Sequence, residues 1–482
     1  MNRARVAVVG GGISGLAAAY RLRTLLGPDA EIVLIDGSRR FGGALRTVEL
    51  AGLALDVGAE AFLMRRPEAV SLIEELGLRG QLTHPTPAAP TVWVAGRTAG
   101  LPTRTVLGLP GAATDVAGLL SAQGVAKVAA EPTVALSWEP GDDASVGLLL
   151  RERAGDELVD RLVDPLLGGV YAGRADALGL RATLPAVAGA LDRGAGSLLA
   201  AAAAVLAPQQ PAPSGRPVPV FGTLRGGLGG LVDALVAAAA VRPRLGAPVR
   251  GLARISGGWR VELGSHLLGR ASPEYLDADA VLLAVPAPAV RRLLVGPLPL
   301  AAAAAGRVEI ASSAVVGLAL PLPAAQALPP SSGVLVAASE RQIESLSVKA
   351  FTFSGRKWAH ASSPEVMLVR ASLGRHGEVR VLQRDDAELI EMVRADLAAL
   401  TGITAAPVDT VVARWGGGLP QYAPGHVAAI AALENAVAQV PGLAVAGAML
   451  HGIGVPACIG TADAAARRIA AHLGAGAPAV RG

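Results

Sequence analysis

A glycine turn close to the amino terminus limits the folds open to this chain more than any other feature. Gly10, Gly12 and Gly15 form the pattern G-x-G-x-x-G between an apolar stretch, Arg5–Val9, and a stretch rich in Ala and Leu, Leu16–Leu26. This order predicts a strand, a tight turn and a helix. The first glycine permits the turn, the second lets a ligand approach the backbone, and the third lets helix and strand pack closely. The N-terminus of the helix would then face a pyrophosphate.

A second apolar stretch completes the unit. Glu31–Ile35 predicts a neighbouring parallel strand, and Asp36 follows it where a dinucleotide site places its ribose-binding carboxylate. We therefore expect an α/β fold, α+β overall, built around a Rossmann-like domain. The alternative, a glycine turn that binds nothing, explains neither the order of these segments nor the acidic residue.

Composition narrows the partners of the chain. Of its 482 residues 52% are hydrophobic, and its formal net charge is +4 with the basic residues scattered, which argues against nucleic-acid binding. The single cysteine, Cys458, excludes a disulfide, a redox pair or a thiolate metal site within one chain. No signal-peptide pattern opens the sequence, and its long uncharged windows are broken by Pro or Gly. We expect a cytoplasmic monomer or homodimer without a metal, at most peripheral at the inner membrane face.

Two further glycine motifs help to decide which dinucleotide is bound. Arg39–Thr47 (RRFGGALRT) contains the pair Gly42 and Gly43 and resembles the second fingerprint of the flavin amine oxidase-like superfamily. Gly447–Gly460 (GAMLHGIGVPACIG) predicts a glycine loop and then a helix from about Pro456, whose N-terminus would stabilise negative charge on a reduced flavin. Alone, these motifs could be a surface turn and a helix cap. Together, in this order, they favour FAD.

Several other segments are similar to the protoporphyrinogen/coproporphyrinogen oxidase family of haem biosynthesis. They are Asp56–Phe62, Asp164–Gly173, Thr223–Leu228, Thr352–Ser354 with Lys357-Trp358, and Leu419–Tyr422. The similarity runs essentially end to end, the run LGGVYAG discriminates best, and the bacterial subgroup that acts on coproporphyrinogen III matches best. The resemblance implies an oxygen-dependent FAD oxidase that transfers hydride from the meso carbons of coproporphyrinogen III to flavin and releases hydrogen peroxide. Protoporphyrinogen IX oxidation, amine oxidation, carotenoid desaturation and a non-catalytic tetrapyrrole carrier remain as alternatives.

The order of the motifs also predicts a domain plan. A linker-like run rich in Pro, PQQPAPSGRPVP at 208–219, predicts an exposed excursion. We leave open a transient contact of the helical insertion with a membrane or with a downstream haem-pathway enzyme. The plan is a discontinuous FAD-binding domain from 1–80, 216–285 and 425–482, a mainly helical insertion at 81–215, and a substrate-binding sheet domain at 286–424.

The expected site residues follow from the motifs and from the resemblance. No catalytic acid or base is assigned, because His360, His426 and His451 are more simply loop or packing residues. Each expected substrate-binding cation could equally be a solvated surface charge, and each aromatic a core residue. The resemblance implies substrate binding by Arg65, Arg66, Leu166, Gly169, Tyr171, Arg174, Phe353 and Lys357. The expected FAD site comprises Gly10, Gly11, Gly12, Ile13, Ser14, Gly15, Asp36, Gly37, Arg39, Gly42, Gly43, Ala44, Arg46, Gly58, Ala59, Glu60, Ala61, Val249, Trp415, Gly447, Ile453, Gly454 and Val455.

Overall fold

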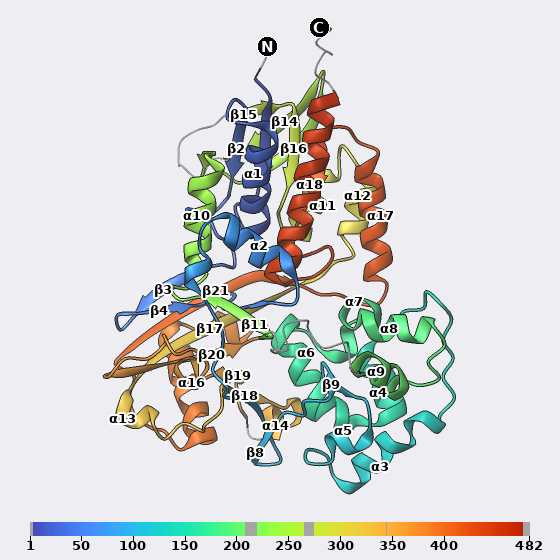
Figure 1. Cartoon of the computed structure of the whole chain (residues 1–482), viewed down its shortest axis with the longest axis vertical. Helices are drawn as coiled ribbons and strands as arrows, with labels where there is room; N and C mark the ends of the chain where they lie inside the picture. Colours follow the sequence, from blue (N-terminus) through green and yellow to red (C-terminus); the bar gives the residue numbers. More distant parts are fainter. Residues whose placement is uncertain (1–2, 208–218, 265–273, 344, 476–482) are drawn as a thin grey trace.

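A parallel sheet of five strands forms one end of the molecule in the computed structural model, which describes residues 3–207, 219–264, 274–343 and 345–475 (Figure 1). The predicted linker at 208–219 lies outside these ranges except for its last residue. The strands follow the order β12, β2, β1, β16, β22, and every neighbouring pair is parallel. They are β1 (Arg5–Val9), β2 (Glu31–Ile35), β12 (Arg242–Arg244), β16 (Ala280–Leu283) and β22 (Leu443–Val445).

Both faces of the parallel sheet are covered, which is why its strands are almost continuously apolar. One face packs on α1 (Ile13–Leu26), α2 (Pro67–Glu75), α10 (Gly229–Ala239) and α18 (Val455–Ala475). The other face packs on α11 (Ala287–Leu294), α12 (Pro299–Ala305), α17 (His426–Ala438) and the antiparallel sheet of β13 (Val249–Ile255), β14 (Gly258–Leu263) and β15 (Glu274–Ala278). The predicted strand–turn–helix–strand unit and the C-terminal helix are confirmed.

A second, mixed sheet lies below the first in Figure 1 and is covered on one face by α16 (Asp386–Thr401). The hairpin of β3 (Thr47–Leu50) and β4 (Leu53–Asp56) packs against this sheet. Its order is β21 (Asp409–Pro420), β17 (Ile310–Pro321), β20 (Val366–Leu373), β19 (Val348–Thr352), β18 (Gly333–Val336), β7 (Pro90–Val94) and β8 (Arg97–Gly100). The expected combination of a parallel nucleotide-binding sheet with a mixed substrate-domain sheet is therefore present.

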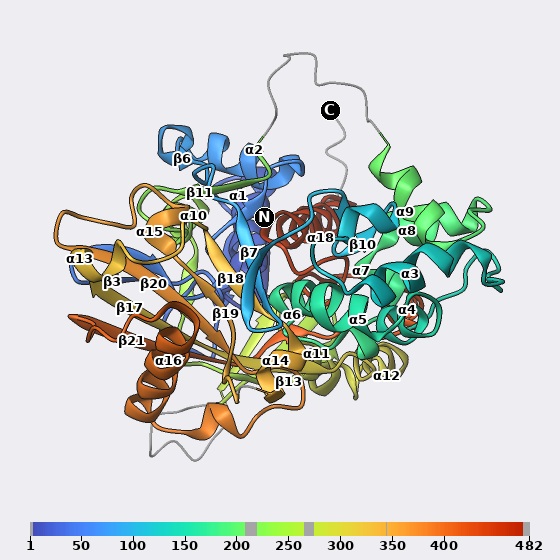
Figure 2. The ribbon, with the colours of Figure 1, turned by 90° about the horizontal axis from the view of Figure 1, so that it is seen from below.

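A helical part lies beside the mixed sheet, as the view from below shows (Figure 2). Its own hydrophobic core is almost separate from the cores of the two sheets. Its main helices are α3 (Ala122–Ala130), α4 (Val146–Ala154), α6 (Asp164–Tyr171), α7 (Leu180–Thr183), α8 (Pro185–Asp192) and α9 (Leu198–Leu206). Among the described residues, no helix is both long and apolar enough to cross a bilayer.

The packing departs from the predicted domain boundaries at two places. β7 and β8 fall within the segment expected to be helical, yet β7 pairs in parallel with β18 of the mixed sheet. α11 and α12 follow residue 285, yet their apolar faces complete the core of the parallel sheet rather than that of the mixed sheet. After the linker, β11 (Phe221–Leu224) pairs with β5 (Phe62–Leu63) and β6 (Leu82–Thr83) in a small antiparallel sheet.

Candidate functional site

The turn between β1 and α1 is so tight that two of its positions admit only glycine. Gly10 has a φ of +106°, and a Cβ built on it would lie 2.2 Å from the carbonyl oxygen of Ala284. A Cβ on Gly15 would lie 1.7 Å from the carbonyl oxygen of Gly10. Gly12 differs, because the nearest atom to its added Cβ is the Gly43 Cα at 3.9 Å. The turn therefore leaves exposed backbone at its middle glycine, as a pyrophosphate site requires.

The second glycine motif lies directly against the first. The Gly42 amide donates to the Gly11 carbonyl over 2.8 Å, and Gly12 and Gly42 form a parallel bridge. Gly43 has a φ of +56°, and a Cβ there would lie 3.0 Å from the Gly12 Cα. Arg40 donates to the Gly43 carbonyl over 3.0 Å. Two motifs that are about 30 residues apart in the sequence thus build one wall of backbone and small side chains.

Asp36 closes one end of this wall. Its carboxylate accepts hydrogen bonds from the backbone amide of Gly11 over 2.6 Å and from the amide and hydroxyl of Ser38 over 2.7 and 2.6 Å. The Ala247 amide donates to the Asp36 carbonyl over 3.0 Å, so the chain enters β13 beside it, with Val249 buried at the first position of that strand. The structure places Asp36 and Val249 close together, as an adenosine-binding end would need.

The third glycine motif approaches the other end of the wall. Gly447 has a φ of +126°, and its nearest neighbour for an added Cβ is the Ser14 hydroxyl at 3.9 Å. Its amide donates to the Thr461 hydroxyl over 3.0 Å, which joins the loop to α18. α18 begins at Val455, one residue before the predicted start, and Ile453 and Gly454 immediately precede it. The C-terminal loop and the N-terminal turn therefore meet across the parallel sheet.

The buried aromatic pair Tyr422 and His426 anchors this loop by hydrogen bonds, and neither residue was predicted to belong to the site. The Tyr422 hydroxyl donates to the Ala448 carbonyl and accepts from the Gly452 amide over 2.9 Å. The His426 ring stacks on the Tyr422 ring at 3.9 Å, and its Nε2 lies 3.2 Å from the Leu450 carbonyl. Burial lowers the pKa of His426, which favours a neutral ring that donates to this carbonyl. The sequence feature that could have indicated Tyr422 is the segment Leu419–Tyr422, which is one of those similar to the family.

Glu60 was expected to contact the cofactor, and its carboxylate is fully engaged with the mixed sheet. It accepts hydrogen bonds from the Lys357 ammonium, from Trp358 Nε1 over 3.1 Å and from Arg370 Nη1 over 2.8 Å. Burial alone would raise the pKa of Glu60, but the charges of Lys357 and Arg370 bring it down to about 2. Arg370 also donates to the Gly58 carbonyl over 2.6 Å. Glu60 thus neutralises Lys357, and only its backbone is left for a cofactor.

The segment between β4 and Glu60 is fixed by two further contacts. The buried Asp56 carboxylate accepts from the Thr47 hydroxyl over 2.5 Å and from the Leu228 amide over 3.1 Å. Burial raises its pKa to about 6. Trp415 Nε1 donates to the Val57 carbonyl over 2.8 Å. The neighbouring Gly58, Ala59 and Ala61 are half-buried and follow these anchors directly, next to Ala44, whose carbonyl accepts from the Ala59 amide.

α6 packs beside β18, and it carries the half-buried Leu166 and the exposed Gly169. Leu166 of α6, Leu335 of β18 and Ile453 of the loop all pack at the edge of the helical core. Gly169 is exposed, and a Cβ on it would lie 3.6 Å from Leu335 Cδ2. The structure therefore places Gly169 beside β18, and the substrate-binding role that the resemblance implies for Leu166 and Gly169 stays a prediction.

The other expected substrate-binding residues lie elsewhere or have partners. Tyr171 is buried beside Tyr422, with ring centroids 5.5 Å apart, and Phe353 is fully buried beneath α16, so both placements favour the alternative reading of core aromatics. Arg174 pairs with Glu378 over 3.1 Å. Arg65 is exposed.

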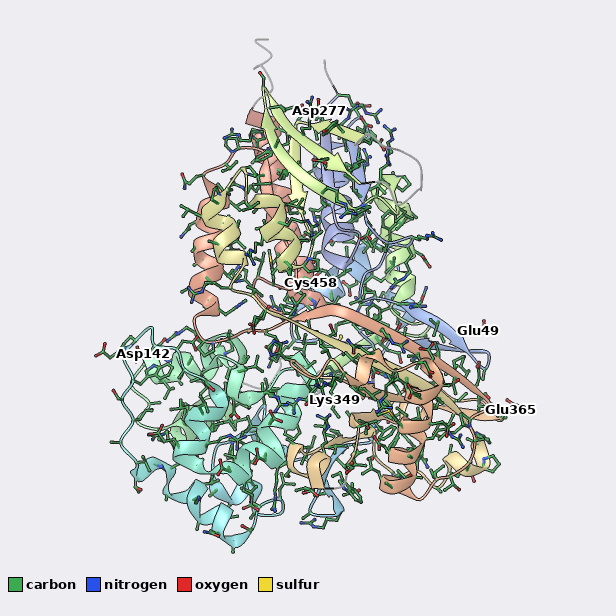
Figure 3. The ribbon with its side chains drawn as sticks, turned by 180° about the vertical axis from the view of Figure 1, so that it is seen from behind. Glu49, Asp142, Asp277, Lys349, Glu365 and Cys458 are labelled. Carbon is green, nitrogen blue, oxygen red and sulfur yellow. The ribbon has the colours of Figure 1, made fainter. Side chains whose placement is uncertain are left out.

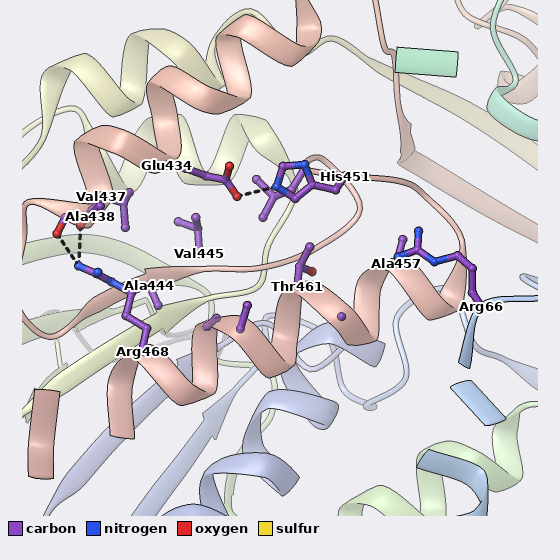
Figure 4. Close-up of a pocket in the computed structure, with 14 residues that line it drawn as sticks. Arg66, Glu434, Val437, Ala438, Ala444, Val445, His451, Ala457, Thr461 and Arg468 are labelled. Atoms are coloured by element: carbon purple, nitrogen blue, oxygen red, sulfur yellow. Dashed lines mark hydrogen bonds and ion pairs between the residues drawn. The ribbon is translucent and has the colours of Figure 1, made fainter. Parts of the chain in front are cut away.

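Arg66 lines a groove between α17 and α18, at the end near the start of α18 (Figure 4). The polar groups of this groove are already paired: His451 with Glu434 over 2.7 Å, and Arg66 with Glu68 over 2.7 Å. Arg468 donates to the last carbonyls of α17. Its walls are mostly Ala and Val, so we do not take this groove as the reaction site.

Known proteins of one family match this chain along nearly its whole length. The family described as flavin containing amine oxidoreductase matches residues 13–470. A coproporphyrinogen III oxidase of Mycobacterium leprae is 45% identical over 469 residues, which cover 97% of this chain and 98% of the relative. A coproporphyrinogen III oxidase of Bacillus subtilis is 30% identical over 96% of this chain and 97% of its own length. A solved structure from Exiguobacterium is 30% identical with a TM-score of 0.82, covering 98% of this chain and 99% of that one.

Proposed function

The chain belongs to the flavin containing amine oxidoreductase family, and we propose that within it the protein is an FAD-dependent coproporphyrinogen III oxidase of haem biosynthesis. The observation that carries the proposal is the 45% identity to a relative of that name over 97% of the chain. Similarity of this extent includes the glycine motifs, α6 and the C-terminal loop. We propose the cytoplasm as its location and a later enzyme of haem synthesis as the recipient of its product.

The three glycine motifs, which contain Gly12, Gly43 and Gly447, form what we call the glycine cradle. This cradle fits FAD in shape and chemistry. A Cβ added to Gly12 or Gly447 would lie 3.9 Å from its nearest neighbouring atom, whereas a Cβ added to Gly10 or Gly15 would collide with backbone atoms. An extended pyrophosphate needs this combination of open backbone and close packing. The first turn of α1 would face the phosphates, Asp36 the ribose, and the N-terminus of α18 the flavin ring. When bound, FAD supplies a two-electron acceptor that oxygen can regenerate with release of hydrogen peroxide.

The residues of the chain would orient a porphyrinogen rather than activate it. A methylene bridge between two pyrroles is an intrinsically good hydride donor, because both rings stabilise the resulting cation. The protein then needs an apolar surface for the macrocycle and a fixed approach to the flavin. Leu166 of α6, Leu335 of β18 and Ile453 of the C-terminal loop each pack against the helical core and would supply apolar side chains to such a surface. Exposed Gly169 adds room beside Leu335 for a planar ring.

An aerobic assay tests the proposal. Purified protein, yellow from bound flavin, should convert coproporphyrinogen III into a fluorescent porphyrin faster than the autoxidation blank and should produce hydrogen peroxide. Protoporphyrinogen IX is assayed beside it, and equal or greater turnover of that substrate would overturn the substrate assignment. A protein that binds no flavin even after FAD is added would favour the non-catalytic alternative. Oxidation of amines would instead indicate that the protein is an amine oxidase, as the description of its family suggests.

A further inference from the structure

Lys349 is a buried amine at an irregular position of the mixed sheet. Val348 pairs with Leu373 of β20, and Ala350 pairs with Ser372, so Lys349 is the extra residue of a β-bulge. A bulge redirects the side chain that it inserts and is often found beside a functional site. Only 8% of Lys349 is exposed.

The surroundings of Lys349 are electropositive and leave it without a carboxylate of its own. Its ammonium donates to one backbone group, the Gly374 carbonyl, over 3.0 Å. Asp396 lies nearby on α16, but it accepts from the amides of Ser347 and Val348. Within the described ranges, each neighbouring arginine has a carboxylate partner and Lys349 has none. The pairs are Arg375 with Asp164 at 2.6 Å, Arg341 with Glu378 at 2.9 Å and Arg370 with Glu60 at 2.8 Å.

This arrangement is unfavourable for a charged lysine unless an anion completes it. Burial, with the positive charges of the three arginines, lowers the pKa of Lys349 to about 7, although the Glu378 carboxylate, which is paired with Arg341, acts in the opposite direction. A buried ammonium needs hydrogen-bond partners and a counter-charge, and Lys349 has one partner for three donors. A carboxylate brought in by a ligand would supply both.

Lys349 also lies where such a ligand would be. Arg375, which neighbours it, lies so close to α6 that a Cβ on Gly168 would be 2.6 Å from Arg375 Nη2. Arg375 also donates to the Gly173 carbonyl over 3.1 Å. Lys349 is therefore found at the junction of the mixed sheet with the helical part (Figure 3), next to the helix that carries Leu166 and Gly169.

We propose that Lys349 binds one carboxylate of the tetrapyrrole. The inference rests on the proposed function. Lys357 and Arg174, the cations expected for this role, already have carboxylate partners, whereas Lys349 has none. Coproporphyrinogen III carries four propionates and protoporphyrinogen IX two, so the former has more edges that can reach this cation.

Product binding tests the proposal. Coproporphyrin III and its tetramethyl ester are titrated, in the same detergent-containing buffer, into flavin-loaded wild type, K349M, K349R and K127M, with porphyrin absorbance as the signal. K349M should bind the free acid about tenfold more weakly, the loss of roughly one charged hydrogen bond, and should bind the ester as wild type does. K349R should recover part of the loss. K127M removes an exposed lysine of α3 and should change neither affinity.

The outcomes separate this proposal from the function on which it rests. Equal weakening of both ligands in K349M would indicate only a structural role, and no weakening would also overturn the proposal. If wild type neither binds coproporphyrin nor oxidises coproporphyrinogen, the proposed function fails instead. If K349M does not fold, calorimetry of the wild type decides instead, with the free acid titrated at about pH 8 in two buffers of different ionisation enthalpy. Binding should take up a proton and the measured heat should differ between the buffers, because the ion pair raises the pKa of Lys349. Heats without buffer dependence would contradict the proposal.

Discussion

At the scale of single residues, Gly15 imposes the strictest requirement on the cradle. A methyl group there would lie 1.7 Å from the Gly10 carbonyl oxygen, and the backbone on both sides is buried. We predict that G15A moves α1 away from β1 and is purified with most of its flavin lost, as read from the visible absorbance per protein. G80A, which adds a methyl group in open space, is the matched control. A G15A protein with full flavin content would show that this turn does not hold the cofactor.

Glu60 should matter for stability more than for binding. E60Q leaves the part-buried Lys357 and Arg370 without their shared counter-charge. Removing one partner of a fully buried ion pair typically costs about 3–5 kcal/mol, and partial exposure reduces that cost here. We expect a markedly lower melting temperature for E60Q, while E49Q, a change at an exposed position of β3, should melt like wild type. Unchanged melting of E60Q would mean that the three groups are solvated in solution.

Asp56 gives the stability a dependence on pH. Its pKa is raised from 3.8 to about 6 in the fold, so the folded state holds the proton more tightly than the unfolded state. The resulting stabilisation is complete below about pH 4 and is lost as the pH rises through 6, by up to about 1.4 kcal/mol per pH unit. Between about pH 4.5 and 6.5 the melting temperature of D56N should therefore fall less than that of wild type. D29N is the exposed control, and parallel curves for all three proteins would contradict the assignment to Asp56.

The sequence could predict the glycines at this scale but not the charge network around Glu60. Gly10 and Gly15 stand in a local pattern whose steric demands are the same in every strand–turn–helix unit. Glu60 and Arg370 are far apart in the chain, and they meet because the segment of β3 and β4 packs against the mixed sheet that contains β20. Phe353 illustrates the same limit, since its burial depends on α16, which covers the sheet from a distant segment.

At the scale of elements, the C-terminal loop depends on Tyr422. Y422F keeps the stack with His426 but removes the acceptor of the Gly452 amide and the donor to the Ala448 carbonyl. Unpaired buried groups of this kind cost about 1–3 kcal/mol. We predict weaker retention of flavin and a shifted flavin spectrum. Y275F, at an exposed tyrosine of β15, should behave as wild type, and so would Y422F if the loop did not contact the flavin.

The elements themselves were largely predictable, and their partners were not. The apolar runs on either side of the first glycine turn and helix predicted the bounds of β1 and β2. β7 was missed although Thr, Val and Trp favour strands, because its short run lies among the Pro- and Gly-rich residues that were assigned to the helical insertion. Its pairing with β18, more than 200 residues later in the chain, has no local sequence signal.

At the scale of the whole molecule, one buried ion pair joins the helical part to the mixed sheet. Asp164 of α6 accepts from Arg375 over 2.6 and 2.9 Å and from the Ala175 amide over 2.9 Å. D164N should loosen this junction, and we expect faster limited proteolysis within the helical part together with a raised KM for the porphyrinogen. D142N, at an exposed loop of the same part, is the control. Identical cleavage of D164N and wild type would show that apolar packing alone fixes the junction.

The central claim is that flavin held in the glycine cradle takes electrons from coproporphyrinogen III. Its most direct test is to mix the flavin-loaded protein with coproporphyrinogen III without oxygen and to follow the visible absorbance of the flavin. We predict rapid bleaching, faster than with protoporphyrinogen IX, and recovery of the absorbance when air is admitted. Flavin that stays oxidised with coproporphyrinogen III, or that bleaches faster with protoporphyrinogen IX or an amine, would contradict the account.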